Sequence, residues 1–351
     1  MVVINPNNSQ VTTHVMGRIR VKAPYKEGGV FLGYIELLFK SIAPIAKASL
    51  VWIGVSTYRG LVVAMIAKLL GRRILLRTSL CGYDDPDSIL KAFRLNTGRL
   101  FLSMVDIIVC NSKLTVQRFY THGYRDKVRY VPNGVDDDFF KPIGVKERRH
   151  LRQRYGIPAD RNVLLYTGAF SKRKNILFLF DVLHILNDRK HHHVLFLLGP
   201  RKRTEYVALD EDYLAEMDHT IHAFGLEKDV IFDSFQDPNA HVYQLADIYV
   251  SASLAEGMPN SMLEAMACGL PVVALDVDGN LKTLVQTGKN GFLLRKSNSN
   301  AFARSILKIT GNSDLKKRFG RQSRKIVEEK HRLTDSADAY YRIIKELAPG
   351  L

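Results

Sequence analysis

Cysteine is scarce in this chain: Cys81, Cys110 and Cys268 are the only three among 351 residues. Three scattered thiols cannot form a disulfide framework, and their spacing matches no zinc motif. The sequence therefore excludes a small disulfide-stapled fold. It favours a reducing compartment, and the cytoplasm is the simplest one.

Long hydrophobic runs are also absent. The longest apolar stretch, residues 61–70, contains Lys68 and reaches about half of the ~20 residues that a membrane span requires. The apolar run at residues 2–4 is too short for a signal peptide, and no basic region precedes it. We expect a chain without a membrane-spanning segment, in the cytoplasm or at the inner face of the cell membrane.

Acidic residues are in the minority, with 35 Asp and Glu against 51 Lys and Arg and a formal net charge of +16. Such a charge favours anionic partners, among them membrane surfaces and nucleic acids. The basic residues are spread along the chain and no nucleic-acid motif accompanies them, so we predict no nucleic-acid partner. Peripheral contact with an anionic membrane remains an expectation.

Apolar runs typical of buried strands alternate with longer helical patterns along most of the chain. This alternation predicts an α/β fold with parallel sheets. A chain of 351 residues exceeds the usual single core, which predicts two domains. The strands are expected at residues 49–53, 73–76, 106–109, 163–166, 194–198, 230–232, 248–250 and 271–274, with helices between them, for example at residues 61–70, 176–186 and 212–224.

Turn residues are dense at residues 132–136, and the charged stretch 146–154 separates them from the next predicted strand. Turns at this density mark the end of one sheet. We therefore predict a first Rossmann-like domain over residues 1–143 and a second over residues 144–334.

Two carboxylates stand eight positions apart between residues 256 and 271. Glu256 follows a predicted buried strand, and Glu264 lies on a helix that is expected to open near Asn260 or Ser261. A helix N-terminus offers N–H groups and positive dipole to a phosphate, and carboxylates accept hydrogen bonds from sugar hydroxyls. Phosphate and sugar together indicate a nucleotide-sugar. A capping box of Ser261 and Glu264 explains Glu264 equally well, but it leaves Glu256 unexplained.

A basic loop at residues 168–175 directly follows the strand predicted at 163–166. Gly168 lets the backbone approach a ligand, and Arg173 and Lys174 supply charge that neutralises a departing diphosphate. The loop could also be an ordinary solvated surface. Because both motifs follow parallel strands of one domain, we favour the binding interpretation.

Residues 253–273 carry the pattern Ser-x-x-Glu-Gly-x-Pro-x-x-x-x-Glu-Ala-x-Ala-x-Gly-x-Pro-Val-Val. This pattern resembles the signature of retaining GT-B glycosyltransferases of family 4, also called glycosyl transferases group 1. The resemblance implies two Rossmann-like doubly wound parallel-sheet domains facing a cleft, with residues 335–351 crossing back onto the first domain. The amino-terminal domain would serve the acceptor and the carboxy-terminal domain the nucleotide-sugar.

The resemblance also implies roles for residues. Glu256 would hold hydroxyls of the transferred sugar and Glu264 the ribose, while Arg173 and Lys174 would bind the pyrophosphate. The predicted catalytic residues are Glu256, Arg173 and Lys174; the predicted donor-binding residues are Gly168, Gly257, Met258, Pro259, Asn260, Ser261, Glu264 and Phe235.

Two departures from the family pattern fall in the first domain. Many relatives place a histidine near residues 78–86, and here Asp84 and Asp85 are the candidates that would orient an acceptor hydroxyl or act as base. The start of a helix with an acidic first turn is the favoured alternative for both. Relatives also begin with a strand and a long helix that this chain is expected to lack, which would leave a gap in the sheet for a partner to cover.

The predicted activity is therefore transfer of a sugar, with retention of anomeric configuration, from a nucleotide-sugar to a hydroxyl of a glycan or lipid-linked acceptor. We expect no cofactor and no metal site, because Arg173 and Lys174 supply the positive charge. Polysaccharide or glycolipid synthesis is the expected setting. A non-catalytic nucleotide-sugar-binding subunit and, less favoured, a sugar-nucleotide epimerase of the same fold are the alternatives.

Overall fold

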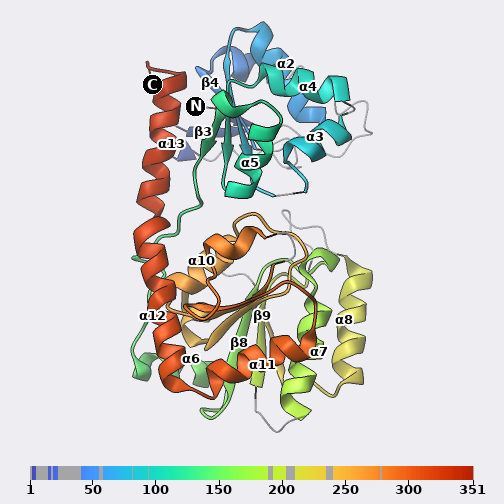
Figure 1. The fold of residues 1–351 in the computed structure, drawn as a ribbon, viewed down its shortest axis with the longest axis vertical. Coiled ribbons are helices and arrows are strands. Elements are labelled where there is room, and N and C mark those ends of the chain that lie inside the picture. Colours follow the sequence, from blue (N-terminus) through green and yellow to red (C-terminus); the bar gives the residue numbers. More distant parts are fainter. Residues whose placement is uncertain are drawn as a thin grey trace. The chain divides into compact units, whose positions relative to one another are not determined.

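The computed structural model describes residues 2–4, 15–16, 19–22, 41–54, 58–80, 82–93, 95–188, 193–202, 210–234, 240–276 and 279–350. The chain forms two compact units, one of Met1–Pro132 with Ser336–Leu351 and one of Asn133–Asp335. Each unit is an α/β layer structure with its own sheet (Figure 1). None of the described helices is both long enough and apolar enough to span a membrane.

The sheet of the first unit has the strand order β2-β3-β1-β4-β5-β6-β7, and every neighbouring pair is parallel except β2 with β3. Its strands are β1 Val2–Ile4, β2 Val15–Met16, β3 Ile19–Lys22, β4 Leu50–Ile53, β5 Arg73–Thr78, β6 Ile107–Cys110 and β7 Val128–Tyr130. Residues 41–46 are helical. The other described helices of this unit are α2 Tyr58–Leu69, α3 Pro86–Ala92, α4 Leu95–Met104, α5 Lys113–Thr121, η1 Arg125–Lys127 and α13 Leu333–Leu347.

The prediction that this sheet has a gap is wrong. Strand β1 lies between β3 and β4 and pairs with both in parallel. The apolar run at residues 2–4 is too short to predict a strand from the sequence. A strand of only a few residues can nevertheless form in the middle of a sheet, because a neighbouring strand pairs with it on each side. Among the described strands of this sheet, the position between β3 and β4 is therefore filled by the chain itself. The predicted absence of the helix concerns residues outside those described.

The sheet of the second unit has the strand order β10-β9-β8-β11-β12-β13 and is parallel throughout. Its strands are β8 Asn162–Thr167, β9 His193–Leu198, β10 Val230–Asp233, β11 Ile248–Ser251, β12 Val272–Leu275 and β13 Gly291–Leu294. The helices are α6 Val145–Arg154, η2 Lys172–Lys174, α7 Ile176–Asp188, α8 Glu211–Ala223, α9 Ala240–Leu245, α10 Asn260–Ala267, η3 Asn280–Thr283, α11 Ser299–Thr310 and α12 Ser313–Lys330.

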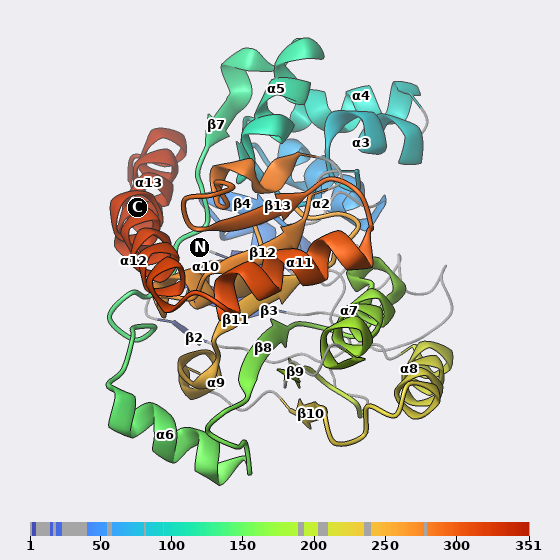
Figure 2. The ribbon, with the colours of Figure 1, turned by 60° about the horizontal axis from the view of Figure 1, so that its bottom comes forward.

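Helices cover both faces of this second sheet, and Figure 2 shows the layers. Along β8, Leu164 and Tyr166 join a core with α7, α8 and α11, whereas Val163 and Leu165 join a core with α9 and α10. Successive side chains of a strand point to opposite faces, so a strand buried on both sides must be apolar throughout. This explains the continuous hydrophobic runs from which the strands were predicted.

The boundary between the units lies at Pro132 and Asn133 instead of at residue 143. Residues just after Asn133 already pack in the second unit: the N–H of Val135 donates to the carbonyl of His331 at 2.9 Å, and Phe140 packs against its core. Helix α13 returns to the first unit, where Ile343 packs with Leu50 and Leu75.

Candidate functional site

The strand order of the second unit reverses between β8 and β11. From β8 the chain proceeds outward through β9 and β10 on one side, and then from β11 through β12 and β13 on the other. Open α/β sheets bind ligands outside the carboxyl ends of the strands at such a reversal. The two predicted motifs begin where β8 and β11 end, so both lie at this point of the sheet.

The loop after β8 is built by unusual backbone conformations. Gly168 has φ of 145°, and Asn175 has φ of 55° in the left-handed region, which only glycine and a few polar residues adopt at low cost. Between them, the single turn η2 is closed by the N–H of Lys174, which donates to the carbonyl of Ser171 at 2.9 Å. This short turn fixes the direction in which its basic side chains point.

The structure brings the three predicted catalytic residues together. Arg173 donates from Nη1 to the carbonyl of Ala255 at 2.8 Å, and its own carbonyl accepts from the N–H of Leu254 at 2.9 Å. Lys174 forms an ion pair with Oε1 of Glu256, and Nη1 of Arg173 lies 3.5 Å from the same oxygen. The loops after β8 and β11 therefore form one cluster of two cations and a buried carboxylate.

Glu256 is also held from the β12 side. Asn280, buried in η3, donates from Nδ2 to the carbonyl of Glu256 at 2.8 Å. From the sequence, residues 276–280 were expected to end a strand and could line the donor side; Asn280 comes after β12 in the chain as the two motifs come after β8 and β11. Three neighbouring strands thus contribute to the position of one carboxylate.

Helix α10 begins at Asn260, as predicted, but the capping-box interpretation is wrong. The N-cap residue is Pro259, and no side chain caps the helix. Ser261 shares a hydrogen bond of 2.8 Å with the hydroxyl of Tyr249, and Glu264 accepts from the hydroxyl of Tyr243 through Oε2. Both side chains therefore face neighbouring structure instead of their own helix terminus.

Three buried tyrosines lie beneath these loops and were missed from the sequence. Tyr166 and Tyr249 belong to β8 and β11, and Tyr243 belongs to α9. Burial raises the pKa of all three hydroxyls, so they stay neutral and can donate. A buried tyrosine needs a partner for its O–H, and a tyrosine in an otherwise aliphatic strand is the signal that could have indicated Tyr166 and Tyr249.

Glu264 differs from a surface carboxylate. Burial raises its pKa, although the hydrogen bond from Tyr243 acts in the opposite direction. Tyr243 also shares a hydrogen bond of 3.0 Å with Thr167 at the end of β8. Glu264 is thus linked to the loop after β8 through one tyrosine.

The remaining predicted donor residues lie at the same turn. Gly257 and Met258 are buried, and the side-chain amide of Asn133 donates to the carbonyl of Met258 and to Oδ1 of Asn260, both at 2.8 Å. Asn133 was not predicted. Phe235 lies outside the described residues.

The two candidate aspartates belong to the first unit. Asp85 is the N-cap of α3, accepts from the N–H of Ser88 at 2.9 Å and pairs with Arg118 at 2.5 Å. The favoured helix-start alternative is confirmed for this residue. Burial acts to raise its pKa, but backbone donors and Arg118 outweigh that effect and lower it.

Asp84 has a different environment. It accepts from the N–H groups of Ser79 and Leu80, each at 2.8 Å, and burial raises its pKa despite these bonds. Its two oxygens thus organise the loop after β5. A role for Asp84 or Asp85 toward an acceptor stays a prediction.

Comparison with solved structures defines the fold. The chain is similar to Anabaena Alr3699/HepE in complex with UDP-glucose, with a TM-score of 0.79 and 21% identity over 93% of this chain and 86% of that chain. It is also similar to sucrose-phosphate synthase from Thermosynechococcus elongatus, with a TM-score of 0.78 and 20% identity over 99% of this chain and 88% of that chain. These two α/β units therefore have the GT-B fold.

Sequence comparison then gives the family. Residues 147–326, just over half of the chain, match the family described as glycosyl transferases group 1, and the chain belongs to this family. A curated relative is the putative glycosyltransferase EpsD of Bacillus subtilis (strain 168), which is 28% identical over 214 residues. That match covers 59% of this chain and 52% of the relative, so the chain spans about half of the relative's length.

Proposed function

We propose that this protein transfers a sugar from a nucleotide-sugar to a hydroxyl group of an acceptor. The observation that carries the proposal is the cluster of Arg173, Lys174 and Glu256 at the strand-order reversal of the second unit. Membership of the group 1 family supports it, and so does the fold likeness to HepE, whose structure holds UDP-glucose.

The cluster suits the charges that develop when a sugar leaves a diphosphate. Negative charge grows on the phosphate oxygens, and the sugar ring becomes oxocarbenium-like. Arg173 and Lys174 would stabilise the departing diphosphate, together with the uncapped N-terminus of α10. Glu256, which can only accept hydrogen bonds when ionised, would hold sugar hydroxyls.

Before a donor binds, Glu256 neutralises the two cations that a diphosphate requires. An arriving diphosphate would replace the carboxylate as the partner of Lys174, and Glu256 would then turn to the sugar. We further propose that Glu264 accepts from a ribose hydroxyl through Oε1, because Tyr243 already occupies Oε2.

Three finer features belong to the proposal. We propose retention of anomeric configuration, a glycan or lipid-linked acceptor in polysaccharide or glycolipid synthesis, and a place at the cytoplasmic face of the membrane. The net charge of +16 supports contact with an anionic surface. Transfer should proceed unchanged in excess EDTA, because two side-chain cations supply the charge that a metal ion provides elsewhere.

The proposal is tested by calorimetric binding of UDP-, GDP- and ADP-sugars to the parent, Glu256→Ala and Arg173→Ala/Lys174→Ala. Arg149→Ala/Arg154→Ala is the control, since it removes the same charge from exposed positions of α6. We expect one nucleotide class to bind the parent and the control at least tenfold more tightly than either site variant. Equal binding by all four proteins would refute the proposed donor site.

Product analysis separates the alternatives. Sugar transfer needs an acceptor, an epimerase yields an altered donor without one, and a non-catalytic subunit binds the donor without consuming it. The subunit alternative was motivated by a gap in the first sheet, and β1 occupies that position.

A further inference from the structure

A pocket lies in the second unit, at the opposite end of the sheet from the proposed donor site. Its volume is about 420 Å³. Asp247 and Pro271, which line it, directly precede β11 and β12, whereas the donor loops follow the carboxyl ends of β8 and β11. The full lining is Pro142, Ile143, Arg148, Gln244, Ala246, Asp247, Cys268, Gly269, Leu270, Pro271, Lys316, Lys317, Gly320, Arg321 and Arg324.

The charge of this pocket is strongly positive. Five of its lining residues are Lys or Arg, and Asp247 is its one carboxylate. Asp247 is already committed: it pairs with Arg148 and Lys316, each at 2.8 Å, and with Arg152 at 2.5 Å. It also accepts from the N–H of Val163 at 2.8 Å. Asp247 therefore cannot balance the other cations of the pocket.

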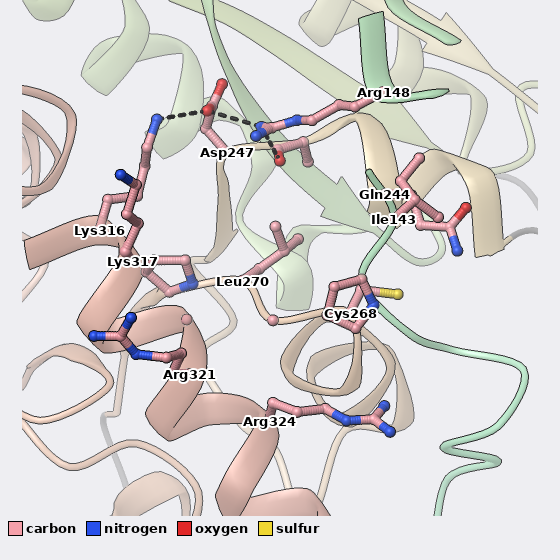
Figure 3. Close-up of a pocket in the computed structure, with 15 residues that line it drawn as sticks. Ile143, Arg148, Gln244, Asp247, Cys268, Leu270, Lys316, Lys317, Arg321 and Arg324 are labelled. Carbon is pink, nitrogen blue, oxygen red and sulfur yellow. Dashed lines mark hydrogen bonds and ion pairs between the residues drawn. The ribbon is translucent and has the colours of Figure 1, made fainter. Parts of the chain in front are cut away.

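Lys317 and Arg321 carry the uncompensated charge. They stand four residues apart on α12, and Figure 3 shows both on the helix that forms one side of the pocket. Among the described residues neither side chain forms an ion pair or a hydrogen bond. Residues four apart on a helix are neighbours, and like charges there destabilise it. Both side chains are exposed, so their charge is available to a ligand.

Other basic residues of α12 form ion pairs with carboxylates of the same helix. Arg324 pairs with Glu328 at 2.6 Å and Lys325 with Glu329 at 3.7 Å, each four residues on. Arg324 also donates from Nη1 to the carbonyls of Phe140 and Ala267. Of the four basic residues by which α12 lines the pocket, Lys316 and Arg324 are thus already paired, whereas Lys317 and Arg321 have no such partner among the described residues.

Next to this helix, part of the pocket lining is apolar and fixed by close packing. A Cβ on Gly320 would collide with the carbonyl oxygen of Gly269, so the backbone of α12 is held directly against the turn after α10. Leu270 and Pro271 continue that part of the lining. The exposed cations beside this fixed lining supply the charged donors that an anion with several oxygens requires.

We propose that this pocket is a second binding site, specific for a phosphate-bearing anion and separate from the donor site. Lys317 and Arg321 are its principal ligand residues. The phosphate is either that of a small soluble compound or that of an anionic lipid headgroup, since both offer the same oxygens.

Calorimetric titration with inorganic pyrophosphate tests the site in three variants of the full chain. Because the proposed donor loop would itself bind pyrophosphate, the variants are compared in the Arg173→Ala/Lys174→Ala background. There we expect Lys317→Ala/Arg321→Ala to weaken the remaining binding at least tenfold. The control Arg318→Ala/Lys325→Ala removes the same charge from exposed positions of the same helix and should keep it. Binding that is absent from the parent, unaffected by the pocket variant, or lost in the donor-loop variant instead would overturn the proposal.

Vesicles identify the source of the phosphate. The second arm measures co-sedimentation with phosphatidylglycerol vesicles, using phosphatidylcholine vesicles as the uncharged reference. Parent binding that pyrophosphate displaces and the pocket variant lacks assigns the site to a lipid headgroup. Pyrophosphate binding without vesicle binding assigns it to a soluble phosphate compound. Vesicle binding that the pocket variant retains in full counts against a lipid ligand at this site.

Discussion

Lys174 is the residue on which the proposed chemistry depends most directly, because it is the cation paired with Glu256. We predict that Lys174→Ala lowers kcat/KM for the donor by about 10²–10³-fold, the usual cost of one preorganised partner of a developing charge. Lys172→Ala, an exposed lysine of the same turn, should stay within about threefold. Steady-state kinetics of nucleotide release measure both, and equal losses would mean that the turn contributes only diffuse positive charge.

Tyr243 gives a second prediction at the residue scale. Tyr243→Phe keeps the ring that packs against Phe140 at 5.5 Å but removes the hydrogen bond to Glu264. Leaving this half-buried acceptor unsatisfied should cost about 1–3 kcal/mol of unfolding free energy at neutral pH.

The pH dependence of that cost follows from the raised pKa of Glu264. A carboxyl group with a raised folded-state pKa binds its proton more tightly in the folded state. Its contribution to stability is complete below the ordinary value of 4.5 and is lost as pH rises through the folded-state pKa. Tyr243→Phe should deepen this loss and Glu264→Gln should abolish it. Chemical denaturation between pH 4 and 8 measures both, and parallel curves for the parent and Glu264→Gln would contradict the prediction.

At the scale of elements, the eight predicted strands are confirmed as β4, β5, β6 and β8–β12. Most of them are apolar runs of strands buried on both faces, so the sequence carried the signal; the edge strand β10 is only partly buried after Val230. Strands β1, β2, β7 and β13 have two to four residues and depend on pairing with neighbours that are distant in sequence. Local pattern contains no information on such pairing.

The candidate site shows the same limit. The sequence could predict which residues of the two motifs belong to the site, because each motif follows a predicted strand. The pair of Lys174 and Glu256 joins residues 82 positions apart, and only the adjacency of β8 and β11 in the sheet creates it. The hydrogen bonds of Asn133, Tyr243 and Asn280 likewise depend on tertiary packing.

The network around Asp247 supports a prediction about how α6, β11 and α12 are joined. Burial acts to raise the pKa of Asp247, but Arg148, Arg152 and Lys316 outweigh it and hold the pKa far below 3.8. The group therefore stabilises the fold above its ordinary pKa, and this contribution is lost as pH falls from there toward the folded-state value.

Asp247→Asn removes the charge and should lower the unfolding free energy at pH 7 by about 3 kcal/mol, since it leaves several cations without their carboxylate. The difference from the parent should shrink as pH falls below about 4. Asp314→Asn, an exposed carboxylate of α12, is the matched control and should change stability by less than about 0.5 kcal/mol. Urea denaturation at a series of pH values measures this; a pH-independent difference would mean that packing, and not charge, explains the loss.

At the scale of the whole molecule, the last helix, α13, returns the chain to its first unit. The stability of that unit can be measured separately, because the unit contains the tryptophan. Trp52 of β4 is the single tryptophan of the chain and stacks on Tyr340 of α13 with ring centroids 5.0 Å apart. Its fluorescence therefore reports on the first unit, including the attachment of α13, whereas circular dichroism reports on both units.

Ile343→Ala should lower the stability reported by Trp52 by about 2–4 kcal/mol, because Ile343 is buried against Leu50 and Leu75 and truncation leaves a cavity. Tyr341→Ala changes a side chain on the same helix that is 59% exposed and should alter stability by less than about 1 kcal/mol. If Trp52 unfolded at the same denaturant concentration in Ile343→Ala and in the parent, α13 would contribute no packing energy to the first unit. A loss confined to the Trp52 signal would show that the carboxy-terminal segment stabilises the unit that contains the amino terminus.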